Sequence, residues 1–248
     1  MDRDLPCGHR CVVVPVLKTG QAMHVGHDEA RTAVLAELDA FVSAVRGLSD
    51  LELMAAGHCT GWTVGDVVVH VHLGLQEMLL GLVTRTDEDA DTDAAGYWRS
   101  APPTNDEDGD QVAGMRFVRL LGAAYRRPAG LVRHLLPTVD GVRAAVTALQ
   151  PGAVRFQGHV LTTGDFLATW AVELAVHHLD LTRELTVAPP AAPALRLART
   201  TIEALAGAEL PRTWADDTAV LLGAGRVRPD SAQQAEAGGV TATFPVLG

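Results

Sequence analysis

The stretch that decides the fold is VGDVVVHVHLGLQEMLLGLV, residues 64–83. Its apolar residues recur at steps of three and four, the spacing that places side chains on one face of an α-helix. Thr63, a residue type that caps helices, stands directly before the run and marks its start. We therefore expect a long helix whose apolar stripe faces a core and consists of Val64, Val67, Val68, Val71, Leu75, Met78, Leu79 and Leu82.

Apolar stripes of the same helical period lie before and after this helix. They cover residues 28–45, 111–126, 131–149 and 162–184, and Pro137 is expected to split the third of them. Long amphipathic helices joined by loops indicate a mainly α fold, an antiparallel four-helix bundle.

The domain organisation follows from where these stripes begin and end. We expect a poorly ordered leader at residues 1–23, the bundle at residues 24–186 and a C-terminal extension at residues 187–248. The extension is punctuated by prolines and glycines, and it contains two short helical patterns, at residues 195–206 and 217–222.

Two connecting segments carry their own expectations. Residues 84–110 are polar and acidic, which predicts a long, mobile surface loop. Tyr97 and Trp98 interrupt that polarity, so the loop is expected to lie at the mouth of a site and to close over a ligand. Residues 154–160 are expected to form a short extended link.

Composition limits the classes of partner. The 248 residues carry a formal net charge of −10, and such an acidic surface repels phosphate backbones, so nucleic acid is not expected to bind. No uncharged apolar run reaches about 18 residues, so we expect no membrane-spanning helix and a soluble, cytoplasmic protein. The three cysteines, an odd number, argue against a disulfide framework.

The candidate chemistry begins in WAVELAVHHLDL, residues 170–181. Glu173 and His177 are four residues apart and therefore point the same way from a helix, whereas His178 points about 100° away. A carboxylate in an inward-facing stripe is unfavourable unless it is paired or bound to a cation. Two readings stay open at this point: a metal held by Glu173 and His177, or a buried Glu–His hydrogen bond that only specifies packing.

The helix at residues 64–83 offers two further histidines. His70 shares a face with Gly74 and Gly81, which lower helix stability and would allow a facing helix or a ligand to come close. Either His70 faces a site or it faces solvent. His72 lies among apolar residues and is expected in the core, with a backbone carbonyl as its partner. It is also the main rival to His70 for a place in the site, because the pattern of one helix does not fix its rotation.

Two motifs resemble a known family. WTVGDVVVH at residues 62–70 resembles the Trp-x-x-x-Asp-hydrophobic-hydrophobic-x-His motif of mycothiol-dependent maleylpyruvate isomerases and their DinB-like relatives. ELAVHHLD at residues 173–180 is similar to the second motif of that family, Glu-x-x-hydrophobic-His-x-x-Asp. The resemblance covers residues 28–184, and Gly225–Arg226 and the FPVLG ending look like a terminal extension found in relatives.

The resemblance implies a DinB-like bundle with a metal site. It implies that His70, Glu173 and His177 bind a divalent metal, usually zinc, and leave one position open for a catalytic ligand. A small thiol, mycothiol or a similar compound, would enter there and lose its proton. Asp180 is expected to orient His177 or the substrate, and Asp66 either orients His70 or stabilises the first turn of its helix.

Three functions remain open from the sequence. The first is a thiol-using metalloenzyme, a mycothiol S-transferase or an isomerase that acts on a small electrophile, as a monomer or homodimer. The second is a metal-dependent hydrolase, and the third is a non-catalytic metal-binding bundle. The family's isomerase has a sizeable C-terminal domain, whereas about sixty residues follow the bundle here, so an electrophile other than maleylpyruvate is expected.

Overall fold

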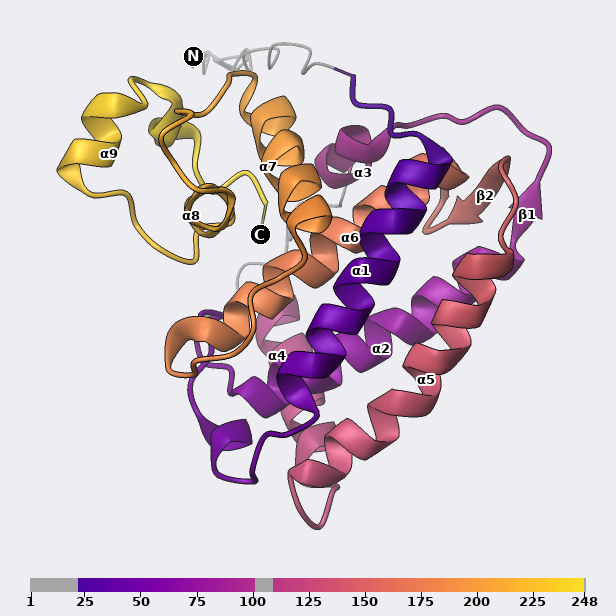
Figure 1. Cartoon of the computed structure of the whole chain (residues 1–248), viewed down its shortest axis with the longest axis vertical. Helices are drawn as coiled ribbons and strands as arrows, with labels where there is room; N and C mark the ends of the chain where they lie inside the picture. Colours follow the sequence, from indigo (N-terminus) through magenta and orange to yellow (C-terminus); the bar gives the residue numbers. More distant parts are fainter. Residues whose placement is uncertain (1–21, 101–108, 248) are drawn as a thin grey trace, which may run out of the picture.

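The structure, a computed structural model, describes residues 22–100 and 109–247. Four long helices form its central bundle: α1 (His27–Val45), α2 (Val64–Val83), α5 (Ala129–Ala148) and α6 (Thr163–Asp180). α1 packs most extensively on α6, and α2 on α5, while contacts of α1 with α5 and of α2 with α6 close the ring (Figure 1). The mainly α four-helix bundle predicted from the sequence is confirmed.

The helices of each close pair run in the same direction, and the two pairs run antiparallel to each other. At the start of α1 the backbone N–H of Val25 donates to Asp165 near the start of α6, and Phe41 contacts His178 near the ends of both helices. Across the pairs, His70 of α2 lies beside His177 near the end of α6. The chain must therefore travel back along the bundle between α2 and α5 before α5 can start, as in bundles with a long crossover.

The crossover contains regular structure. It includes β1 (Arg85–Thr86), α3 (Ala94–Ser100) and α4 (Gly109–Ala123). The prediction of a long surface loop over residues 84–110 was therefore wrong in part. Buried Ala94 and Ala95 hold α3 against α6 and α7, which the polar composition of the segment concealed. Residues 101–108 of the predicted loop lie outside the described residues.

A small antiparallel sheet closes one end of the bundle. β2 (Ala153–Phe156) pairs with β3 (His159–Thr162), Phe156 opposite His159, and β1 pairs with the other edge of β2. Gln157 and Gly158 form the turn with φ values of 47° and 85°, the left-handed pair that a tight two-residue hairpin requires. The predicted extended link at residues 154–160 is thus a β-hairpin.

Pro137 does not split its helix. α5 is continuous from Ala129 to Ala148 with Pro137 inside it, so that prediction was wrong. The proline is exposed, and the ring costs α5 one backbone hydrogen bond. Buried side chains on both sides of it keep the helix docked on α1 and α2, namely Leu131, Val132, Leu135, Val139, Val142 and Val146.

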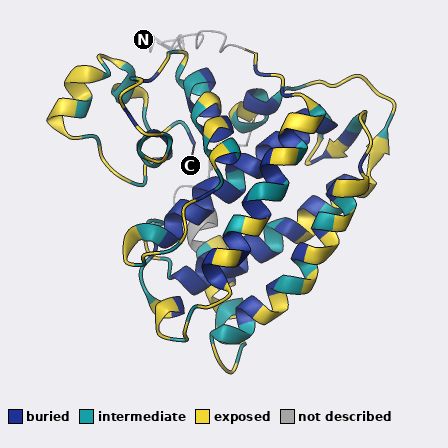
Figure 2. Ribbon diagram, viewed as in Figure 1, coloured by how far each residue is buried: buried dark blue, intermediate teal, exposed yellow. Residues whose placement is uncertain are grey.

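The C-terminal part packs on one side of the bundle. α7 (Ala192–Ala206) covers α1 and α6, and α8 (Asp216–Gly223) packs against α7 and α6 (Figure 1). α9 (Ser231–Glu236) follows, and short 3-10 helices span Glu52–Met54, Leu181–Arg183 and Val240–Thr243. Figure 2 shows buried residues concentrated where the central helices meet, and exposed ones on their outer faces.

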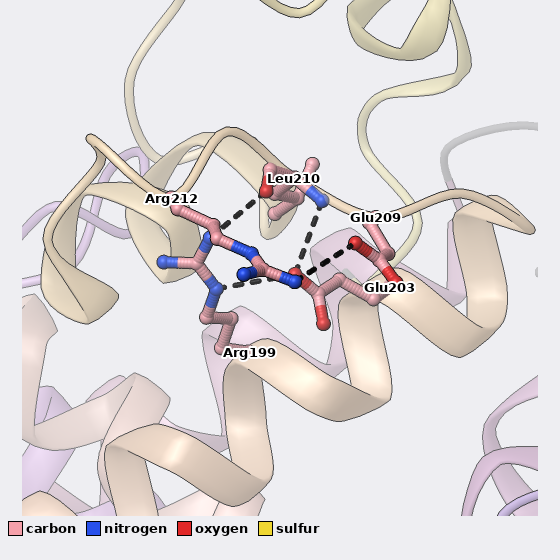
Figure 3. Close-up of a pocket in the computed structure, with 5 residues that line it drawn as sticks. All are labelled: Arg199, Glu203, Glu209, Leu210 and Arg212. Carbon is pink, nitrogen blue, oxygen red and sulfur yellow. Dashed lines mark hydrogen bonds and ion pairs between the residues drawn. The ribbon is translucent and has the colours of Figure 1, made fainter.

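A cluster of charged residues fastens the loop between α7 and α8 (Figure 3). Arg199 of α7 donates to the carbonyl oxygens of Pro211 and Trp214, each at 2.8 Å, and to the carboxylate of Glu203 at 3.1 Å. The guanidinium of Arg199 therefore fixes the backbone of the loop at Pro211 and Trp214, which is a structural role.

Among the described residues, α2 is long and apolar enough to cross a membrane by length and composition alone. A single helix of this kind is weak evidence, because core helices of bundles meet the same criterion. Here 56% of the apolar window is buried, against α4, α5 and α6.

Candidate functional site

The structure brings together the three residues predicted as metal ligands. His70 comes from α2, and Glu173 and His177 come from the facing part of α6. The Nε2 atoms of His70 and His177 each lie 3.2 Å from the same carboxylate oxygen, Oε1 of Glu173. The ligating atoms of all three residues lie within 4.8 Å of one another.

Local sequence places His70 in this position. Thr63 accepts a hydrogen bond from the backbone N–H of Asp66, while the Asp66 carboxylate accepts one from the backbone N–H of Thr63, so the start of α2 is fixed by a capping box. Asp66 thus stabilises the first turn of the helix, which is one of the two roles predicted for it. From this start, His70 projects towards α6 two turns along.

Glycines on the same face of α2 bring α6 close. A Cβ at Gly74 would lie 3.1 Å from the ring of Trp170, and one at Gly81 would lie 2.6 Å from the ring of Phe166. The prediction that Gly74 and Gly81 admit a facing helix is confirmed. Both contacts fall on the helix that carries Glu173 and His177, so they set the separation across which His70 meets them.

The two neighbouring histidines lie outside the cluster. His72 is buried between α2 and α5, where its Nε2 lies 2.9 Å from the hydroxyl of Thr138, so the predicted backbone partner was wrong. His178 is also buried and lies 2.7 Å from Glu37 and 2.9 Å from the carbonyl oxygen of Ala188. Both imidazoles already have partners, as expected for residues that only pack the core.

Asp180 contacts the other ring nitrogen of His177. Its Oδ2 lies 2.8 Å from Nδ1 of His177 and accepts a hydrogen bond from the thiol of Cys59 at 2.9 Å. Its Oδ1 accepts a hydrogen bond from Nε of Arg226, also at 2.9 Å. A carboxylate behind a histidine in this way fixes the tautomer, so that Nε2 is left to face a metal.

Sequence reasoning missed Cys59 and Arg226 as members of the site. Cys59 comes from the connection before α2, and Arg226 comes from the turn after α8, so no spacing within one helix relates them to His177. The only available signals were that Cys59 stands close before the first motif and that Arg226 lies in a turn resembling relatives.

A ring of aromatic contacts completes the cluster. Trp62 stacks against His177 with ring centroids 6.4 Å apart, and it meets the ring of His70 edge-on at 5.1 Å. Trp62 of the first motif therefore contacts both imidazoles.

The charges within the site are coupled. Burial disfavours the charged form of Glu173, but the charge of His177 and the hydrogen bonds from His177 and His70 outweigh it and hold the pKa of Glu173 well below its usual range. Burial would also lower the pKa of His177, whereas Glu173 and Asp180 raise it well above 6.5. Although burial opposes it, the hydrogen bond and charge of His177 lower the pKa of Asp180 to about 2. Among the residues of the site, the positive charge that keeps Glu173 and Asp180 ionised is therefore that of His177, with Arg226 also paired to Asp180.

The cluster opens into a cavity of about 670 Å³. His70 and Glu173 are each about one-third exposed, so their polar ends can reach a molecule in this space, whereas His177 is 8% exposed. Residues of α3, α4, α6 and the C-terminal segment form the walls, among them Trp98, Phe117, Val172, Val176 and Leu247. Of the two aromatic residues predicted to lie at the mouth of the site, Trp98 lines the cavity, whereas Tyr97 is not among its described lining residues and lies beside Phe156 and His159. Whether the segment that carries Trp98 moves stays a prediction.

The donor set suits a divalent metal. Donors bound tetrahedrally to zinc at about 2.0–2.1 Å lie about 3.3 Å apart, close to the 3.2 Å separations found here. A second group, Cys59, His177 and Asp180, also has its ligating atoms within 4.8 Å. Asp180 already binds the guanidinium of Arg226, whose positive charge opposes a second cation there. The His70, Glu173 and His177 group is the better candidate.

Fold and site together define a DinB-like helical bundle with a candidate His–Glu–His metal centre. The family model described as the mycothiol maleylpyruvate isomerase N-terminal domain matches residues 34–182, more than half of the chain. The chain belongs to this family, which consists of mycothiol-related, metal-binding proteins. No curated protein and no solved structure matches the chain significantly.

Proposed function

We propose that the protein is a zinc-dependent enzyme that joins a small thiol, mycothiol or a similar compound, to a small electrophile. The observation that supports this most directly is that two imidazole Nε2 atoms and one carboxylate oxygen converge at the wall of a cavity. The family supplies the link to mycothiol. The products would be a thioether, if a leaving group departs, or an isomer, if the thiol is later eliminated.

In this proposal His70, Glu173 and His177 hold the ion. Bound there, a divalent zinc ion would lower the pKa of an incoming thiol, so that the sulfur is presented to the electrophile as a thiolate. Three protein ligands leave one position for that sulfur, which is the pattern of catalytic rather than structural zinc sites.

The surrounding residues keep the ligands in place. Asp180 accepts the Nδ1 proton of His177 in a hydrogen bond and so keeps the Nε2 lone pair directed at the ion. Nε of Arg226 donates a hydrogen bond to Oδ1 of Asp180 at 2.9 Å and so fixes the position of this carboxylate. Trp62 packs against both imidazoles and limits their rotation and the access of water.

The proposal is tested by metal content and thiol-dependent turnover. His70→Ala, Glu173→Ala and His177→Ala should each lose bound zinc and turnover together. His134→Ala, which replaces an exposed histidine of α5, should retain both. His72→Ala should also retain bound zinc, because His72 faces Thr138. This variant is informative because His72 is only two residues from His70.

Two results would contradict the proposal. Retention of zinc by the double variant Glu173→Ala/His177→Ala would show that the ion does not bind at this site. Full turnover with no thiol present would indicate that the same centre works as a hydrolase on bound water.

A further inference from the structure

The walls of the cavity around the candidate metal centre are mainly apolar. Trp62 and Trp98 contribute indole rings, and Phe117 contributes a phenyl ring from α4. Branched or flexible apolar side chains from α4, α6 and the C-terminal segment complete the surface, namely Met115, Val118, Val172, Val176 and Leu247. A ligand that fills this space would place its surface against carbon rather than against polar atoms.

Positive charge is scarce in the same walls. Among the described lining residues, only Arg226 has a permanent positive charge, and two of its donors are used by Asp180 at 2.9 Å and by the carbonyl oxygen of Ala224 at 3.0 Å. His58 also lines the cavity, but burial lowers its pKa, so its imidazole is neutral near pH 7.

The charge balance at the centre points the same way. The carboxylates of Glu173 and Asp180, the guanidinium of Arg226 and a divalent ion leave one net positive charge. A thiolate at the open position would neutralise it. The wall residues that the structure describes then include no unpaired cation for a substrate with two carboxylates. A carboxylate without a partner is strongly disfavoured in an apolar cavity.

We propose that the electrophile is an uncharged aromatic or branched apolar compound rather than a dicarboxylate. This inference rests on the proposed function and names the substrate class of the same site. The rings of Trp98 and Phe117 and the side chains of Val172 and Val176 bind the apolar part, beside the cluster of His70, Glu173 and His177.

The test compares two product analogues that differ only in the part derived from the electrophile. The probes are the S-benzyl and S-(1,2-dicarboxyethyl) thioethers of N-acetylcysteinamide, which carry no thiol proton and no leaving group. Their dissociation constants with the zinc-loaded full chain are measured by titration calorimetry. The benzyl thioether should bind at least tenfold more tightly.

A matched pair of variants on α4 locates the effect. Phe117→Arg introduces a cation into the cavity wall, and Leu120→Arg introduces the same cation on an exposed position of the same helix that does not line the cavity. Phe117→Arg should reduce the preference for the benzyl thioether at least fivefold, whereas Leu120→Arg should leave it unchanged. Both side chains are more than half exposed, so both variants should fold.

Each outcome bears on a different part of the account. Equal or tighter binding of the dicarboxyethyl thioether to the unmodified chain would overturn the substrate class and leave the thiol chemistry standing. If Leu120→Arg changes the preference for the benzyl thioether as much as Phe117→Arg does, the cavity wall does not determine which electrophile binds. If neither thioether binds, no thiol product fits the cavity, and the proposed function fails with the inference.

Discussion

Asp180→Asn should weaken zinc binding although Asp180 is not among the proposed ligands. The carboxylate is fully buried and contacts Nδ1 of His177 at 2.8 Å. Asparagine keeps the size of the side chain but loses the charge, so His177 is less basic and its orientation is less strictly fixed. Residues that orient metal-bound histidines typically contribute about 10–100-fold to metal affinity, which corresponds to about 1.4–2.7 kcal/mol.

The same change should also lower the stability of the metal-free protein. Arg226, 18% exposed, would lose its anionic partner. Removal of one member of a fully buried pair costs about 3–5 kcal/mol, and the partial exposure of Arg226 should place the loss below that range.

The assay is a competition titration of zinc against a chelating dye, at a temperature where every variant is folded. Asp66→Asn is the matched control, because Asp66 is also a largely buried aspartate but belongs to the capping box of α2. It should lower stability by about 1 kcal/mol or less and leave zinc affinity within twofold. The reasoning is refuted if Asp180→Asn also binds zinc within twofold of the unmodified chain, or if Asp66→Asn weakens binding as much.

Three further predictions concern stability. Gly81→Ala should destabilise the protein by about 1–3 kcal/mol in urea unfolding, because the new Cβ would meet the ring of Phe166. Gly141→Ala on α5, where the nearest neighbour of a new Cβ is 3.9 Å away, should stabilise it by about 0.4–1 kcal/mol in the same assay. Destabilisation of equal size at both positions would contradict the packing argument. Glu37→Ala should cost about 1–3 kcal/mol because Nδ1 of His178 and the backbone N–H of Ala191 lose their hydrogen-bond partner. A loss under 1 kcal/mol in the same assay would exclude that role. The hydrogen bond and charge of Asp165 raise the pKa of His24 above 6.5, so this contact contributes stability below pH 6.5 that is lost as the pH rises through the raised pKa. His24 is largely exposed, so the effect is small. A difference in unfolding free energy between the unmodified chain and His24→Ala that grows with pH would show the sign to be wrong.

The helices were largely predictable because they depend on short-range spacing, whereas the set of three candidate ligands was predicted from the resemblance of two motifs to a family. The stripe at residues 64–83 and the i, i+4 relation of Glu173 and His177 are properties of single helices. The structure places α2 at the predicted residues and brings His70 to that pair. The sequence pattern of one helix does not fix its rotation, so it left His72 as a rival to His70. The structure decides between them, because Gly74 and Gly81, on the face of His70, contact α6.

The remainder depended on contacts that no local pattern encodes. Cys59 and Arg226 reach Asp180 from connections that are distant in sequence from α6. The helix α3 lay hidden in a polar segment because only Ala94 and Ala95 are buried in it. Pro137 was expected to split a helix, but packing on both sides of it outweighs one missing hydrogen bond. The domain boundaries proposed from the sequence stay predictions.

Zinc X-ray absorption spectroscopy on the full chain, recorded without and with a small thiol, tests the central claim most directly. Without thiol, the account predicts only nitrogen and oxygen neighbours at about 2.0–2.2 Å, from His70, Glu173, His177 and solvent. With thiol, one sulfur neighbour should appear at about 2.3 Å. A sulfur neighbour before the thiol is added would place the ion at a cysteine rather than at His70, Glu173 and His177. The absence of a sulfur neighbour after saturation with thiol would contradict the proposed chemistry.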